Sequence, residues 1–302
     1  MKKNKFYKLF WQEVEKNYPL PRKSRNIIEI DFNNFEKILK DDDEAKVKKI
    51  IYNLYFGDFY LIKGAFKTSF LNRIKKECFD YFSNAPSTFY KMLEGTPDFQ
   101  RKIDLQTGKK YSFERCSHSF YFYRWNNDPL NIFGEIDEKW RLVKKLMGLD
   151  FDAYEKNTPK DGVVDRVQLV KYPSSIGFLE PHSDPYKFQK LFISGYMSKK
   201  DKDFTGLGFY LIDQNDKIVE IENTIETGDM GLGYATVQHG VAPVNTYKNP
   251  DWDDINDGRW FLSMYSNQSD EVKKRHTGYS LENKVEIINE NDYQIRPIKK
   301  YA

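Results

Sequence analysis

The second half of the chain is a spaced series of short segments with the β-strand pattern, and no helical pattern separates them. Residues 165–172 alternate in polarity and are rich in residues that favour strands. A run of short strands without intervening helices favours a sandwich or a jelly roll. The later strands are predicted at residues 191–197, 208–212, 218–221, 234–239 and 261–265.

The first half of the chain mixes helices and strands. Strands are predicted at residues 27–30, 59–66 and 119–125, and helices at 45–55 and 136–147, the second ended by Gly148. Thr68 is expected to cap a further helix. Its apolar residues recur along one face, which indicates packing against a core: Phe70, Leu71, Ile74, Cys78 and Phe82. Residues 84–112 are expected to form a loop with one short helix.

These patterns predict a single domain over residues 1–302, mainly β with N-terminal helices. Residues 1–160 would support a double-stranded β-helix (a jelly roll) at residues 161–267, which would carry a metal site. The charged residues 268–302 would form a tail on the surface.

Three residues in the predicted β region are candidate metal ligands. His182 and Asp184 are two residues apart, so in a strand both side chains point to one face. His239, from a distant strand, would complete a set of two imidazoles and one carboxylate. This facial set leaves coordination positions open and is typical of non-haem Fe(II) oxygenases. The alternative is a turn in which Asp184 caps a backbone N–H and Pro185 ends the segment.

Arg259 begins the next strong strand, which runs through Trp260 and Phe261 to Tyr265. A guanidinium held at a strand start can bind a dicarboxylate by two parallel hydrogen bonds. The alternative is an arginine on the surface.

These residues resemble the 2-oxoglutarate/Fe(II)-dependent dioxygenases over residues 163–267, and the pattern is closest to prolyl hydroxylases. The resemblance implies a cupin-like jelly roll, iron bound by His182, Asp184 and His239, and 2-oxoglutarate held by Arg259 with Tyr172 nearby. Phe261 stands where many relatives have serine, so Ser263, further along the same strand face, is the remaining candidate for a cosubstrate contact. Phe178 stands where several relatives have tyrosine.

The resemblance further implies hydroxylation of a C–H bond with O₂, with release of succinate and CO₂. Asp184 favours this outcome because halogenating relatives usually carry a small residue there. We expect a small or medium polar metabolite as the substrate: an amino acid, a sugar or a natural-product intermediate. The alternatives are a peptidyl hydroxylase, a cupin-like metalloprotein that does not use 2-oxoglutarate, and a binding module without activity. Residues 247–258 would be a lid or an ordinary loop.

The composition bears on partners and compartment. Net charge is +3 with scattered basic residues, which argues against nucleic-acid binding. No apolar run could span a bilayer, and the two cysteines, Cys78 and Cys116, cannot build a disulfide framework, so a cytoplasmic location without membrane contact is expected. His118 and His276 are expected to be packed or solvated rather than metal ligands. Oligomeric state is left open.

Overall fold

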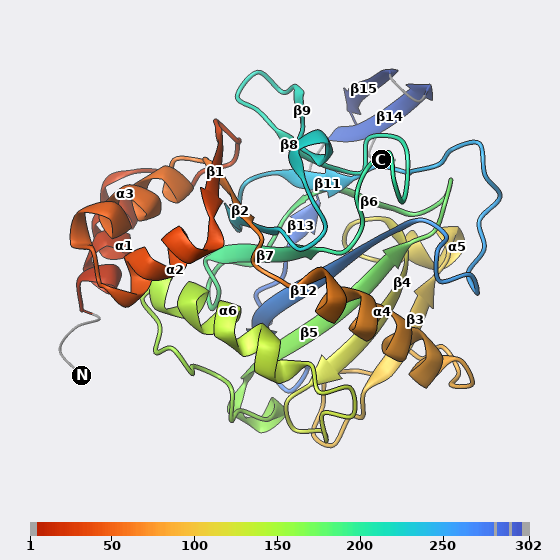
Figure 1. Cartoon of the computed structure of the whole chain (residues 1–302), viewed down its shortest axis with the longest axis horizontal. Coiled ribbons are helices and arrows are strands. Elements are labelled where there is room, and N and C mark those ends of the chain that lie inside the picture. Colours follow the sequence, from red (N-terminus) through yellow and green to blue (C-terminus); the bar gives the residue numbers. More distant parts are fainter. Residues whose placement is uncertain (1–4, 281–282, 290–291, 298–302) are drawn as a thin grey trace.

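Two facing sheets form the body of the molecule in the computed structural model, which describes residues 5–280, 283–289 and 292–297 (Figure 1). The larger sheet has the strand order β1-β2-β10-β7-β12-β5-β4, with β3 paired to β4. The smaller sheet has the order β6-β11-β8-β9, with β13 paired to β6. The two are joined where Arg115 and Cys116 of β4 pair with Leu179 and Phe178 of β6. This curled arrangement confirms the predicted jelly roll.

The strands of the larger sheet are β1 (Ile27–Asp31), β2 (Phe59–Lys63), β3 (Phe99–Ile103), β4 (Arg115–Tyr123), β5 (Val163–Tyr172), β7 (Leu191–Tyr196), β10 (Met230–Tyr234) and β12 (Arg259–Gln268). Those of the smaller sheet are β6 (Phe178–Ser183), β8 (Phe209–Ile212), β9 (Ile218–Glu220), β11 (His239–Val241) and β13 (Tyr279–Ser280). A separate ribbon consists of β14 (Asn283–Asn289) and β15 (Asp292–Pro297).

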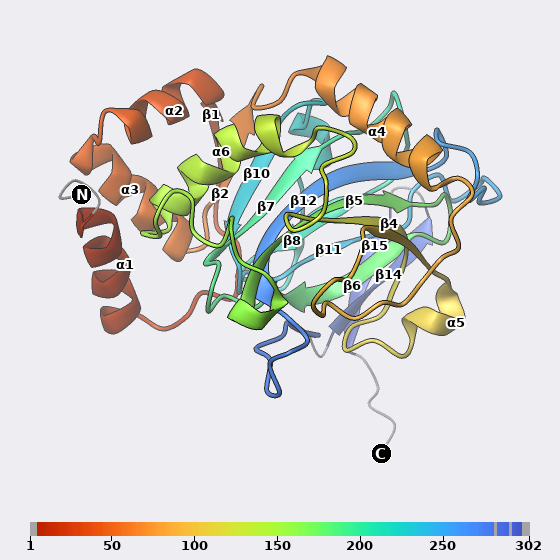
Figure 2. The same cartoon turned by 90° about the horizontal axis from the view of Figure 1, so that it is seen from below.

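Helices cover the outer face of the larger sheet. Figure 2 shows α4 (Thr68–Phe82) and α6 (Phe133–Leu146) over that face, while α1 (Lys5–Asn17), α2 (Phe32–Lys40) and α3 (Glu44–Tyr55) gather beside the β1 edge. The one-turn helix α5 (Leu105–Gly108) precedes β4. None of the helices in the described residues combines the length and the apolar character that a bilayer crossing requires.

Successive side chains of the central strands point to opposite faces of the larger sheet, so the two faces contribute to two different buried regions. In β12, Trp260, Leu262 and Met264 are buried in the core beneath the helices. The intervening residues of β12, such as Phe261, belong to the space between the two sheets. The functional groups of this strand therefore lie on its inner face, while its outer face supplies the apolar packing that holds the sheet.

Several predicted boundaries were wrong. Residues 234–239 do not form one strand: β10 ends at Tyr234, where the N–H of Val237 donates to its carbonyl at 2.9 Å in a tight turn, and β11 begins at His239. Thr68 is the first residue of α4 rather than its cap. Residues 84–112 contain β3, and α1 and α2 were not expected. The buried stripe of α4 is confirmed, and both cysteines are free and buried.

Candidate metal centre

His182 and His239 are neighbours across two paired strands. His182 lies near the end of β6 and faces His239, the first residue of β11, in the antiparallel register. Their ring centroids are 4.4 Å apart. The ring of His182 stacks on Phe113 with centroids 4.5 Å apart, and His239 lies 4.3 Å from Phe192. These contacts hold both imidazoles in one orientation.

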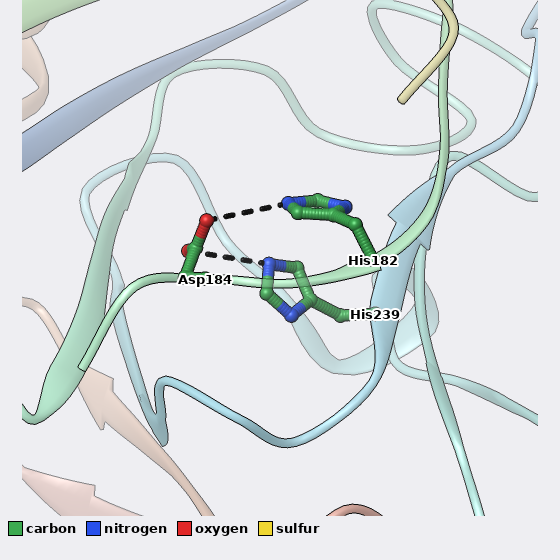
Figure 3. Close-up of side chains that lie close together, drawn as sticks. All are labelled: His182, Asp184 and His239. Carbon is green, nitrogen blue, oxygen red and sulfur yellow. Dashed lines mark ion pairs between the residues drawn. The ribbon is translucent and has the colours of Figure 1, made fainter. Parts of the chain in front are cut away.

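Asp184 completes the group from just beyond the end of β6 (Figure 3). Its backbone N–H donates to the carbonyl of Ala235 at 2.8 Å, so the chain stays extended past the strand end. One carboxylate oxygen lies 3.5 Å from Nε2 of His182, and the other lies 3.7 Å from Nε2 of His239. Ligand atoms of all three residues lie within 4.8 Å of one another, the only such group of His, Cys and acidic residues in the described part of the chain.

Hydrogen bonds from the other ring nitrogens direct both Nε2 atoms inward. Nδ1 of His182 is 2.9 Å from the carbonyl of Glu180, and Nδ1 of His239 is 2.8 Å from the carbonyl of Val237. A carbonyl only accepts, so each Nδ1 carries a proton, and in the neutral ring the lone pair is then on Nε2. Burial, together with the neighbouring His182, lowers the pKa of His239 to about 4. Its imidazole is therefore neutral at pH 7, the form that binds metals.

The three residues line a cavity of about 600 Å³ between the sheets. From β4, β5 and β12 of the larger sheet, alternate residues reach this cavity, as the strand period requires. Examples are Gln168, Val170 and Tyr172 of β5 and Arg259, Phe261 and Ser263 of β12. Pockets of 300–1,000 Å³ are typical of small-molecule sites.

Arg259 is buried at one end of this inner face, with 2% of its surface exposed. It pairs in register with Tyr172, and Gly258 precedes it with a φ of +83°. A Cβ on Gly258 would stand 1.9 Å from the carbonyl oxygen of Tyr172, so only glycine fits where the chain enters β12. The backbone conformation of Gly258 thus fixes the position of the Arg259 backbone, from which the side chain extends.

Glu222, in a short 3₁₀ turn, is the counterion of Arg259. Nε of Arg259 donates to Oε1 of Glu222 at 2.5 Å, and the backbone N–H of Phe209 donates to the same oxygen at 2.8 Å. Oε2 of Glu222 is buried without a hydrogen-bond partner among the described residues. Burial raises the pKa of Glu222 even though Arg259 opposes this effect. No local sequence pattern marks this contact, because the closure of the two sheets creates it.

Tyr172 and Ser263 also line the cavity. The ring of Tyr172 stacks on Phe261 at 5.8 Å, and burial raises its pKa above the ordinary tyrosine value. Both residues are therefore placed on the same inner face as Arg259.

The remaining candidates have other surroundings. His118 is a packed, neutral residue whose Nε2 lies 2.6 Å from Oε1 of Gln100. His276 is half-buried and lines the cavity, and it is not part of the group of candidate metal ligands. None of residues 247–258 lines it, so this loop is not a lid over the described cavity. Nζ of Lys171 fastens the loop by donating to the carbonyls of Asp251 and Trp252 at 2.8 and 3.2 Å.

No family model matches the chain, and no curated protein matches it. Solved structures similar to it include a full-length Neurospora crassa protein in complex with alpha-KG, with 13% identity, 80% of this chain and 85% of that chain covered, and a TM-score of 0.49. A Pseudomonas putida prolyl-4-hydroxylase has 10% identity, coverage of 75% and 97%, and a TM-score of 0.48. JOX2 in complex with 2OG, Fe and JA has 16% identity, coverage of 88% and 85%, and a TM-score of 0.45.

Proposed function

We propose that this chain is a non-haem Fe(II) oxygenase of the 2-oxoglutarate-dependent superfamily, in which His182, Asp184 and His239 bind the iron. The observation that carries the proposal is the placement of one carboxylate between two Nε2 atoms, at 3.5 and 3.7 Å. Two atoms that share an ion at about 2.1 Å are no more than about 4.2 Å apart, and both distances meet this limit.

The donor set suits Fe(II). Two neutral imidazoles and one carboxylate on one side of an ion leave the other side open for cosubstrate and O₂. Backbone carbonyls hold the Nδ1 protons, as they do in many metal-bound histidines. A cupin-like site without 2-oxoglutarate is the competing function, but it offers no reason for a buried arginine on the cavity wall.

In this proposal Arg259 binds the distal carboxylate of 2-oxoglutarate. A guanidinium has five N–H donors in a planar fork. Glu222 takes the Nε donor, and no other hydrogen bond of Arg259 is formed among the described residues. The Nη groups can therefore grip a carboxylate in the cavity, with Tyr172 and Ser263 on the same wall.

When bound, iron and 2-oxoglutarate supply the oxidising chemistry: O₂ is consumed, the keto acid leaves as succinate and CO₂, and a substrate C–H bond becomes C–OH. The protein residues bind and orient. Glu180 and Val237 keep the ligand protons on Nδ1, and Phe113 and Phe192 hold the ligand rings. The cavity volume favours a small or medium polar metabolite over a peptide, which would need an open groove.

The test is an anaerobic titration of metal-free protein with Fe(II) and then 2-oxoglutarate, read by bound iron and by the visible absorbance of the complex. We expect one iron per chain and succinate release in air. Asp184→Asn should lose the iron, whereas Asp216→Asn, at an exposed aspartate that pairs with Lys23, should retain it. Arg259→Ala should weaken 2-oxoglutarate binding with iron retained. Iron binding that survives in Asp184→Asn, His182→Ala and His239→Ala would refute the assignment.

A further inference from the structure

The cavity wall is strongly basic beyond the Arg259 end. Among the described residues that line it, the acidic side chains are Asp184 and Asp270, and the basic ones are Lys91, Arg101, Arg115, Arg166, Arg259 and Arg275. Asp184 belongs to the proposed metal centre, and Asp270 pairs with Arg275. The remaining positive charge is therefore not balanced by the wall itself.

Three arginines of this set converge from adjacent strands. Arg101 lies on β3, Arg115 begins β4 and Arg166 lies on β5. Arg166 pairs in register with Tyr123 and Tyr265, so it lies on the inner face at the opposite end of β5 from Tyr172. Six residues of strand separate those ends, roughly 20 Å.

None of these three arginines forms an ion pair with a carboxylate in the part of the chain that the structure describes. Nε of Arg115 and Nε of Arg166 are both buried, and neither has a hydrogen-bond partner there. Arg101 donates to the carbonyls of Thr88 and Tyr90 and to no other acceptor among the described residues. The three arginine residues are half-buried. A guanidinium held partly away from water without a counterion is less stable than a paired one, so this arrangement favours the binding of an anion.

The positive charges of the three arginines affect the pKa of Tyr121. Burial alone would raise its pKa, yet Arg101, Arg115 and Arg166 together lower that pKa below the ordinary tyrosine value. Burial, with Arg115 and Arg275 nearby, likewise lowers the pKa of Arg166. Three cations therefore act on one small volume of the cavity.

We propose that Arg115 and Arg166, supported by Arg101, bind an anionic group of the substrate, so that the molecule oxidised is a small organic anion bearing a phosphate, sulfate or carboxylate. This substrate class rests on the proposed oxygenase function. Guanidinium forks match the oxygens of such groups by paired hydrogen bonds. Arg115 stacks over Tyr111 at 4.3 Å, and the same cavity holds Phe113, so an apolar or aromatic body would be accommodated beside the charge.

Two groups of arginines would bind the two anions. Arg259 with Tyr172 would bind the distal carboxylate of 2-oxoglutarate, and Arg166 at the other end of β5, with Arg115 from the start of β4, would bind the substrate anion. The acceptor for oxidation would then lie between them, beside His182 and Asp184, which line the same cavity.

The experiment measures binding to metal-free protein by calorimetry, with phenyl phosphate, phenyl sulfate, benzoate and neutral phenol as matched probes. We expect at least one anion to bind about tenfold or more tightly than phenol, with inorganic phosphate competing and affinity falling as salt rises. Which of the three anions binds most tightly identifies the preferred group.

Variants locate the binding. Arg115→Met and Arg166→Met should each weaken the preferred anion about tenfold, and Arg166→Lys should weaken it less because the charge remains. Arg22→Met, at an exposed arginine outside the cavity, should bind as the parent does. Arg166→Met should leave 2-oxoglutarate binding intact in the iron-loaded protein.

Equal affinity for phenol and all three anions, or no binding of any probe, would overturn the proposal, as would unchanged anion binding in both Met variants. If a Met variant fails to fold, the comparison of anion with phenol in the unaltered protein still decides. Because these measurements need neither iron nor 2-oxoglutarate, failure of the oxygenase assignment would appear separately, as absent iron binding.

Discussion

Glu222→Gln is expected to tighten the binding of 2-oxoglutarate while destabilising the protein. Glutamine keeps an oxygen to accept from Nε of Arg259 and from the N–H of Phe209 but removes the negative charge. If a carboxylate on the far side of the guanidinium lies roughly 6 Å from the Glu222 carboxylate, their repulsion at an effective dielectric of about 20 is about 3 kcal/mol.

Allowing half of this value for relaxation, the affinity for 2-oxoglutarate should rise about tenfold. Without the cosubstrate, the variant leaves Arg259 buried without its counterion. The free energy of unfolding should then fall by about 3 kcal/mol, the lower end of the range for a broken buried pair.

The affinity is read from an anaerobic titration of the iron-loaded protein, and the stability from urea unfolding of the metal-free protein. Glu155→Gln is the matched control, because Glu155 pairs with Arg141 at 2.6 Å and does not line the cavity. Affinity for 2-oxoglutarate that stays unchanged or falls in a folded Glu222→Gln protein would show that Arg259 does not bind the cosubstrate carboxylate.

Two further predictions concern stability. Burial lowers the pKa of His118 to about 3. The stability that the neutral ring contributes is therefore complete above about pH 6.5, the pKa in the unfolded chain, and is lost as the pH falls from about 6.5 to about 3. Between pH 7 and pH 4.5 the loss is roughly 3 kcal/mol, and His118→Gln should remove that part of the acid dependence in urea unfolding of metal-free protein; an unchanged pH slope would count against it. Gly258→Ala should cost several kcal/mol and weaken 2-oxoglutarate binding, since its Cβ would meet the Tyr172 carbonyl. Gly64→Ala, also at positive φ but in open space, should cost only about 1 kcal/mol, and equal melting temperatures for the two variants would contradict this reasoning.

The sequence was sufficient where a strand has two chemically different faces. β5 was predicted because polar and apolar residues alternate along it, whereas β12 was predicted from the apolar run that follows Arg259. The family resemblance put Tyr172 near Arg259, and both residues line the cavity. The sequence was misleading near residues 235–238, where β-forming residues occupy a turn. β3 was missed because it is a short strand among turn formers.

Contacts that form only when the two sheets come together could not be predicted from the sequence. His182 and His239 could be grouped with Asp184 because the chain has only four histidines and Asp184 lies two residues after His182. Glu222 could not be paired with Arg259, since nothing local marks a glutamate in a 3₁₀ turn. Arg166 could have been noticed, because it shares its strand face with Gln168 and Tyr172. That Arg166 has no counterion among the described residues could be seen only from the positions of the neighbouring strands in the structure.

The strand order also has a consequence for synthesis on the ribosome. β2, near the beginning of the chain, pairs with β10, and β6, which carries His182, pairs with β13 at Tyr279–Ser280. The sheets therefore cannot be assembled in the order in which their strands emerge. Until about residue 280 has left the exit tunnel, β6 lacks one of its edges, and the nascent chain exposes unpaired strands that are open to aggregation or to chaperones.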